Sequence, residues 1–185
     1  MAISILDPLV DKAGGIRKTA AWYRNAVSSI ADRTSARRLM GQGKLIGRPS
    51  IGRLNMFFYD PKYKKTLPYY DTFPLVLPLE RYDDGFLGIN LHYLPMTLRI
   101  RLLDRLVDYS NNTKFDESTR LAVDYSKLKN LNLIKPTLKR YLAGRVKTQF
   151  RRIDADEFTV AALLPVQRFK KASASEVYSD SRKMI

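Results

Sequence analysis

GRLNMFFYDPKYKKTLPYYDTFPLVLPLERYDDGFLGINLHYLP, residues 52–95, is the part of the chain that best indicates the type of fold. It contains three runs with the composition of strands, at residues 55–59, 72–77 and 86–93. Asp83-Asp84-Gly85 predicts a hairpin turn in which Gly85 has a positive φ, because glycine adopts that conformation at low cost. Pro74 and Pro78 predict an edge or bent position for the second run, because proline donates no hydrogen bond to a neighbouring strand. The stretch thus predicts a small antiparallel sheet.

Helical patterns follow this β-rich stretch. A helix is expected from Pro95 to about Tyr109, because leucines recur there at helical spacing. Further helices are predicted at residues 117–131, 136–142 and 158–164, with a short strand at 148–150. Ser173-Ala-Ser-Glu176 is a capping box that predicts a last helix. The expected fold class is α+β: a small antiparallel, SH3-like, partly open β-barrel packed by several α-helices, with an extended helical N-terminal arm.

The N-terminal residues form a different region. Residues 1–14 are apolar and interrupted by Pro8, as in an arm that docks on a partner. A helix is predicted from residue 16 to residue 30, because apolar residues recur at spacings of four and three. That seam fits packing on the chain's own domain, and it also fits pairing with another chain. The candidate partner-docking residues are Ile16, Ala20, Tyr23, Val27 and Ile30.

Residues 32–52 are rich in glycine and arginine and carry no acidic residue after Asp32. This composition predicts a mobile or extended basic linker. Gly41-Gln-Gly-Lys44 within it lacks the spacing of a phosphate-binding loop, and Leu45 stands where such a loop needs Ser or Thr. We therefore expect three regions: an arm with a docking helix at 1–31, the linker at 32–52, and an α+β core domain at 53–185.

The overall composition restricts the classes of partner. The chain has 33 Lys and Arg against 18 Asp and Glu, which gives a formal net charge of +15. Such a charge favours binding to nucleic acid, an anionic membrane or an acidic protein surface. The chain has no cysteine, so a disulfide scaffold and thiolate metal sites are excluded. No apolar run approaches the ~20 residues of a membrane span, and we expect no signal peptide, no membrane partner and no small-molecule substrate.

Basic side chains gather in several short stretches that are candidates for contact with phosphates or acidic proteins. Between the first two β-type runs, lysines alternate with Tyr63, Tyr69 and Tyr70, as on surfaces that bind single-stranded nucleic acid. The same pattern also fits tyrosines that cover a barrel edge and lysines that protect it from pairing. The candidate contact residues are Arg37, Arg38, Lys44, Lys62, Lys64, Lys65, Lys139, Arg140, Arg151 and Arg152, and a further basic patch spans 168–171.

Catalytic chemistry is not expected. His92 is the one histidine, and on an apolar strand a lone histidine is more often a core or rim residue than a base. Asp60-Pro61-Lys62 matches the end of a nuclease motif, but Pro61 would break the strand that such a motif needs. No set of ligands with metal-binding spacing is present. We therefore expect no enzyme activity, no cofactor and no metal site.

Several strings together resemble a conserved protein of T4-like contractile-tailed bacteriophages. They are Phe57-Phe-Tyr-Asp-Pro-Lys62, Lys65-Thr-Leu-Pro-Tyr-Tyr-Asp71, Gly85-Phe-Leu-Gly-Ile-Asn-Leu-His-Tyr-Leu-Pro95 and Leu164-Pro-Val-Gln-Arg-Phe169. The resemblance covers most of the chain after residue 52 and extends more loosely to the helix around Trp22. It implies a virion or assembly protein, assembled in the host cytoplasm and carried in the virion, with no catalytic residues to transfer.

Two functions of different class remain open. In the first, the chain is a structural or assembly component of the neck, tail or baseplate, docked on neighbouring virion proteins, in a symmetric ring, through its N-terminal arm and basic surfaces. In the second, it is a DNA-binding protein without sequence preference that engages the phage genome or its ends, as a DNA end protector does. Non-specific DNA contact is compatible with either function.

Overall fold

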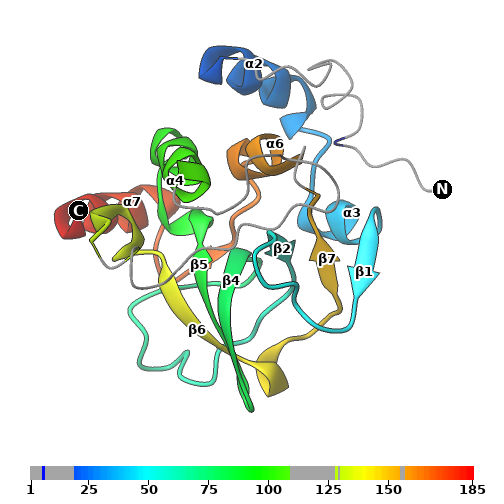
Figure 1. The fold of residues 1–185 in the computed structure, drawn as a ribbon, viewed down its shortest axis with the longest axis vertical. Helices are drawn as coiled ribbons and strands as arrows, with labels where there is room; N and C mark the ends of the chain where they lie inside the picture. Colours follow the sequence, from blue (N-terminus) through cyan, green and yellow to red (C-terminus); the bar gives the residue numbers. More distant parts are fainter. Residues whose placement is uncertain (1–5, 7–18, 109–127, 129, 155–156) are drawn as a thin grey trace.

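The computed structural model describes residues 6, 19–108, 128, 130–154 and 157–185, and Figure 1 shows how their elements are arranged. A six-stranded antiparallel sheet has the order β1-β7-β2-β4-β5-β6, and β3 and β8 form a separate pair. The strands are β1 (Lys44–Ile46), β2 (Asn55–Met56), β3 (Tyr70–Asp71), β4 (Leu75–Tyr82), β5 (Gly85–Asn90), β6 (Leu138–Leu142), β7 (Phe150–Arg152) and β8 (Phe169–Lys170). The helices are α2 (Ala20–Ala31), α3 (Ala36–Met40), α4 (Met96–Asp108), α6 (Phe158–Leu163) and α7 (Ala174–Met184), with short 3-10 turns at Leu91–Tyr93, Asn132–Ile134 and Ala143–Arg145. The expected α+β class with an open antiparallel sheet is confirmed.

The β4–β5 hairpin lies inside the sheet, between β2 and β6. Tyr82 pairs with Gly85, so that Asp83 and Asp84 alone form the connection, as predicted. The predicted positive φ of Gly85 is wrong, because the described glycines with positive φ are Gly43 and Gly52. Gly85 is required for another reason: a Cβ atom there would overlap the carbonyl oxygen of Tyr141 on β6. This glycine lets the neighbouring strand approach closely.

The second β-type run was expected to be an edge strand or a bent strand, and the edge position is wrong, because β4 lies between β2 and β5. Leu75 and Val76 pair with β2, whereas Pro78 lies beyond the end of that short strand. Pro78 therefore leaves no ladder hydrogen bond unmade on that side, and the β4–β5 register shifts between Pro78 and Glu80. The proline therefore coincides with an irregularity in a strand that stays paired on both sides of it.

The predicted helix at 136–142 is wrong, because these residues contain β6. The free edge of β5 has unpaired backbone groups, and residues 138–142 satisfy them in an antiparallel ladder that pairs Phe86 with Tyr141. Tertiary pairing thus outweighs the local helical signal of Pro136. The strand expected at 148–150 is shifted to β7, which begins at Phe150.

The two faces of the sheet bury different side chains, because successive strand residues point to opposite sides. Leu75 and Leu77 belong to the main apolar core together with α2, α4 and α6. Figure 1 shows these helices gathered at one end of the sheet. Val76 belongs to a second, mostly aromatic cluster that also contains Phe57, Tyr59, Phe86, Tyr141 and Phe150. The second cluster supports the region described below as the candidate site.

Helix α2 packs on the chain's own core. The Thr19 side chain caps its N-terminus by accepting a hydrogen bond from the backbone of Trp22. Tyr23, Val27 and Ile30 are buried in the main core, and α2 contacts α6. Three of the five predicted docking residues are therefore used within the chain, while Ile16 lies outside the described residues. Docking of the same seam on another chain stays a prediction.

Residues 32–52, expected to be an extended linker, contain regular structure. Helix α3 buries Ala36 and Leu39, and β1 pairs with β7 through the partners Lys44 and Arg152. The linker was expected because of the high glycine content, but in the structure these glycines lie at the ends of short helices and strands. The expected arm at 1–14 lies outside the described residues except for the buried Leu6. The predicted helix at 117–131 lies outside them except for residues 128, 130 and 131, of which Leu128 is buried.

Three C-terminal predictions are confirmed. Helix α4 begins one residue after Pro95 and buries Leu102, Leu103 and Leu106. Helix α6 occupies the predicted range, and α7 begins with the predicted capping box of Ser173 and Glu176. Within the described parts of the chain, none of the helices combines the length and the apolar character needed to cross a bilayer.

Candidate nucleic-acid interface

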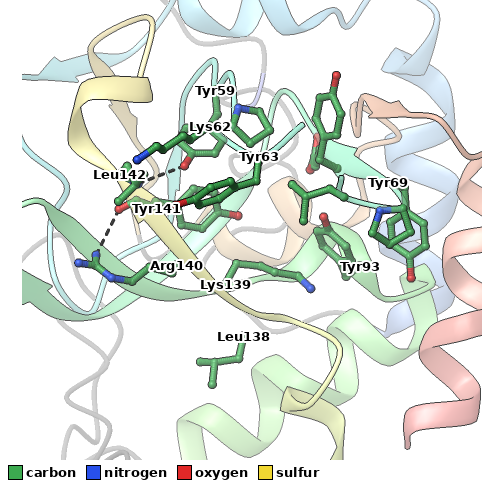
Figure 2. Close-up of a pocket in the computed structure, with 15 residues that line it drawn as sticks. Tyr59, Lys62, Tyr63, Tyr69, Tyr93, Leu138, Lys139, Arg140, Tyr141 and Leu142 are labelled. Carbon is green, nitrogen blue, oxygen red and sulfur yellow. Dashed lines mark hydrogen bonds between the residues drawn. The ribbon is translucent and has the colours of Figure 1, made fainter. Parts of the chain in front are cut away.

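A cavity of about 480 Å³ lies between strand β6 and the loop of residues 61–70. We call it the tyrosine pocket, because six of its lining residues are tyrosines. Figure 2 shows side chains from the loop and from β6 facing the same space. The lining residues are Tyr59, Pro61, Lys62, Tyr63, Leu67, Pro68, Tyr69, Tyr70, Asp71, Tyr93, Leu138, Lys139, Arg140, Tyr141 and Leu142.

The loop wall of the tyrosine pocket is held in place at several points. Backbone turns join Pro61 to Lys64 and Tyr63 to Thr66, and the Lys64 ammonium lies 2.8 Å from the Asp60 carboxylate. Lys171 donates to the backbone carbonyls of Lys65 and Leu67, each at 2.9 Å. The loop then enters β3, which pairs with β8. These contacts preform the wall, so a ligand would not have to order it.

The tyrosines differ in how far they are exposed. Tyr59, Tyr93 and Tyr141 are buried with their ring edges or faces in contact with other aromatic rings. Burial raises the pKa of the Tyr93 and Tyr141 hydroxyls, so these groups stay neutral. Tyr63 is 62% exposed, in contrast to its buried neighbours. A large aromatic ring left in solvent at the rim of an aromatic pocket is available for a ligand.

Lys139 supplies a partly buried positive charge inside the tyrosine pocket. Its Nζ atom lies 4.1 Å from the centre of the Tyr93 ring, toward which it extends in Figure 2. Burial lowers the pKa of Lys139 to about 8, because removal from water disfavours the charged ammonium. Among the described residues, none of the salt bridges involves Lys139.

Two other cations line the pocket in different ways. The Lys62 Nζ atom lies 5.3 Å from the centre of the exposed Tyr63 ring. The Arg140 guanidinium stacks 4.0 Å from the centre of the Tyr82 ring and forms an ion pair with Asp84. Arg140 is therefore engaged within the β4–β5–β6 sheet, whereas Lys62 extends from the loop.

The structure thus brings together basic stretches that are far apart in sequence. Lys62 comes from the loop, Lys139 and Arg140 come from β6, and Lys171 of the patch at 168–171 holds the loop from outside. Lys64 and Lys65 lie in the same loop, exposed and outside the cavity lining. The predicted alternation of lysine and tyrosine therefore does form an aromatic and cationic surface.

The remaining predicted contact residues lie elsewhere. Arg37 and Arg38 are exposed on α3. Lys44, Arg53 and Arg152 all contact the Asp154 carboxylate, at 3.4, 3.4 and 3.0 Å. Arg151 is buried, donates to the Leu39 carbonyl at 3.0 Å and lies 3.5 Å from Glu157. We call these four cations and two carboxylates the β1–β7 cluster.

Sequence reasoning missed two buried polar groups that join segments distant in sequence. Arg99 is fully buried and donates to the carbonyls of Leu94 and Ala162 and to the hydroxyl of Tyr178. Asp71 lies 2.8 Å from Nδ1 of His92, which is a buried core residue as expected. The sequence signal that could have indicated the buried Arg99 was an arginine among the leucines of the predicted helix.

The Asp71–His92 pair has a defined charge state. Burial lowers the pKa of His92 against the attraction of Asp71, which keeps the imidazole neutral. Burial alone would raise the pKa of Asp71, but His92 and the backbone N–H groups of Phe73 and Arg168 hold that pKa below its ordinary value. The pair is an ionised carboxylate with a neutral imidazole, and its full burial suits a structural role.

The arrangement of the tyrosine pocket suits nucleic acid. Aromatic faces stack on bases and lysines neutralise phosphates, and this combination is typical of proteins that bind nucleic acid strands without reading sequence. Within the described part of the chain, no group of three or more acidic or histidine side chains is placed to hold a metal ion. The fold and site define a small basic α+β protein with an aromatic and cationic pocket.

The particular family follows from comparison with known proteins. Residues 12–183 match the family described as phage T4 terminal DNA protecting protein, and the chain belongs to this family. No curated protein and no solved structure matches the chain. The resemblance to a protein of T4-like bacteriophages is therefore confirmed.

Proposed function

We propose that this protein binds the ends of the linear phage genome and shields them from exonucleases. The family description names DNA termini, and the tyrosine pocket offers the chemistry that a DNA end requires. The single observation that carries the proposal is the meeting of six tyrosines with Lys62 and Lys139 in one preformed cavity. Cations on the surrounding surface add sequence-independent attraction to phosphates.

The end-binding function takes the place of the neck, tail or baseplate role, which nothing in the family description supports. We place the action on phage DNA in the host cell, and carriage of the protein in the virion is part of the proposal. Docking on other virion proteins through residues 16–30 is a secondary expectation, since Tyr23, Val27 and Ile30 are already used in the core.

Shielding requires no catalysis. A protein that occupies the terminus denies a nuclease access to the last phosphodiester bond, and affinity and residence time alone decide the protection. We therefore propose a binding protein without enzyme activity or cofactor.

The test compares a linear duplex with the same sequence as a closed circle. We expect the purified protein to bind the linear form more tightly at near-physiological salt and to slow its digestion by a processive exonuclease. A double variant, Lys62→Met with Tyr63→Ala, should lose most of this protection, whereas Lys44→Met in the β1–β7 cluster should keep it. Equal binding to circle and linear DNA, with no protection, would refute the proposal.

A further inference from the structure

We infer that the tyrosine pocket takes the unpaired terminal nucleotide of a DNA end, with its base against the tyrosine rings and its phosphate at Lys139. The inference rests on the proposed end-binding function and specifies its ligand. It predicts that the protein recognises an end through an opened or overhanging nucleotide rather than through the outside of the duplex.

Access to base faces is the first argument. Inside a duplex each base is covered on both faces by its neighbours, so an aromatic side chain can stack only on a terminal, unpaired or extruded base. A pocket lined by six tyrosines therefore discriminates ends from continuous duplex without reading sequence. Enzymes that extrude a base from the stack also hold it between aromatic and apolar side chains.

The size and shape of the cavity give the second argument. Its volume of about 480 Å³ lies in the lower part of the range of about 300–1,000 Å³ that holds small ligands, and a nucleotide is a ligand of this size. The walls are fixed by the contacts of Lys171 and by the β5–β6 ladder. The bulk of the duplex would remain outside the rim, where Tyr63 provides a stacking surface for a second base.

Lys139 gives the third argument. A partly buried charge is costly unless an opposite charge accompanies it, and none of the salt bridges among the described residues joins a carboxylate to this ammonium. Asp71, which also lines the pocket, is bound to His92. The phosphate of a bound nucleotide would provide the missing partner. Arg140, the next residue, is already engaged by Asp84 and Tyr82, so Lys139 is the cation best placed to bind a phosphate inside the cavity.

The experiment uses the full-length protein and duplexes in which a flexible non-nucleotide linker closes one end. The open end is blunt, or carries a short 5′ or 3′ overhang whose last base is fluorescent 2-aminopurine, and a third DNA is closed at both ends by flexible non-nucleotide linkers, so that it carries no unpaired base. We expect an overhang to bind on the order of tenfold more tightly than the blunt end, with quenching of the fluorescence as the base stacks on tyrosine. The doubly closed DNA should bind most weakly.

Two variants and a control locate the site. Lys139→Met should remove most of the preference for the overhang, and Tyr63→Ala should reduce both the affinity and the quenching. Lys65→Met is the matched control, because it removes one exposed charge from the same loop outside the cavity lining. Thermal melting checks that each variant is folded, and Tyr63→Ala, at an exposed position, keeps the test valid if Lys139→Met does not fold.

The possible results distinguish a failure of the inferred nucleotide site from a failure of the proposed end-binding function. Preference for open ends, without preference for overhangs or quenching, would overturn the inference and leave the proposed function standing. Normal overhang binding by both variants would also overturn it. If the doubly closed DNA binds as tightly as the open ends, the proposed function and the inference both fail.

Discussion

The molecule has two basic regions, the tyrosine pocket and the β1–β7 cluster, and they use positive charge in opposite ways. In the β1–β7 cluster, Lys44, Arg53 and Arg152 share Asp154, and Arg151 contacts Glu157. In the tyrosine pocket, aromatic rings accompany Lys62 and Lys139 instead of carboxylates. A carboxylate neutralises a cation and fixes it within the fold, whereas a ring stabilises the cation and leaves its charge available to an anion.

This contrast shows why net charge alone identifies a partner poorly. The formal charge of +15 counts the buried Arg99 and Arg151 equally with the exposed Lys62. A surface that binds DNA is better recognised by cations beside aromatic rings than by the density of cations in the sequence. The β1–β7 cluster is as basic in sequence as the pocket, yet its contacts indicate that it stabilises the fold.

The largest expected effect tests the stabilising role of the β1–β7 cluster. Arg151→Met leaves the carboxylate of Glu157 buried without this arginine and removes the hydrogen bond to Leu39, so the free energy of unfolding should fall by about 3 kcal/mol or more. Denaturant unfolding measures the change, and Lys44→Met, at the exposed edge of the same cluster, should cost at most ~1 kcal/mol. Equal stability of Arg151→Met and the parent would mean that the cluster does not hold β7 in place.

The second prediction concerns the sheet beneath the tyrosine pocket. Gly85→Ala places a methyl group against the Tyr141 carbonyl, and the strand that carries Lys139 must shift, at a cost of about 2 kcal/mol. Because the shift moves one wall of the pocket, DNA affinity should fall as well, in contrast to Arg151→Met measured under folding conditions. Ala substitution at Gly144, where a Cβ meets nothing within 4 Å, is the control. A normal melting temperature for Gly85→Ala would contradict the close approach of β6.

Gly85 also illustrates what the sequence predicted of the fold. The hairpin and the capping box at Ser173 were predicted because local residues determine them. Helix α4 was predicted because its leucine spacing reflects burial on one face. Two features were missed: the need for a glycine at position 85, and the strand formed by Leu138–Leu142. Both depend on the pairing of β5 with β6, two strands that are distant in sequence.

The candidate site was predicted in part for the same reason. The alternation of Lys62 and Tyr63 with later tyrosines marked the loop wall, since that pattern is local. The separate basic stretches were named as candidates for contact with phosphates or acidic proteins, and their sequence positions did not indicate that Lys62, Lys139 and Arg140 line one cavity. Only the pairing of β6 with β5 shows that Lys139 faces Tyr93.

The third prediction compares one lysine from each region. Lys62→Met should weaken binding of linear DNA roughly fivefold at low salt and reduce the slope of log K against log salt by about 1, because one phosphate contact is lost. Lys44→Met should change the slope by less, since the Asp154 carboxylate lies 3.4 Å from that ammonium and offsets part of its charge. A salt titration followed by fluorescence anisotropy gives both slopes. Equal slopes for the two variants would mean that the regions do not differ in their contact with DNA.

The smallest expected effect is a pH dependence of stability and DNA affinity that Lys139 in the tyrosine pocket causes and Lys44 in the β1–β7 cluster does not. The ordinary pKa of a lysine is 10.5 and that of Lys139 in the folded protein is about 8, so between these values the unfolded chain holds a proton that the folded chain has lost. The contribution of Lys139 to the stability of the free protein should therefore rise with pH across this window, since the cost of its partly buried ammonium is fully present below pH 8. A bound phosphate favours the charged form and raises the pKa again, so DNA binding takes up a proton. Affinity for linear DNA should consequently fall about twofold from pH 7 to pH 8 while stability increases, and Lys139→Met should remove both trends.

Lys44→Met should leave both trends unchanged. If Lys139→Met retains the fall in affinity, another group carries the titration and Lys139 is not the cation that meets the phosphate.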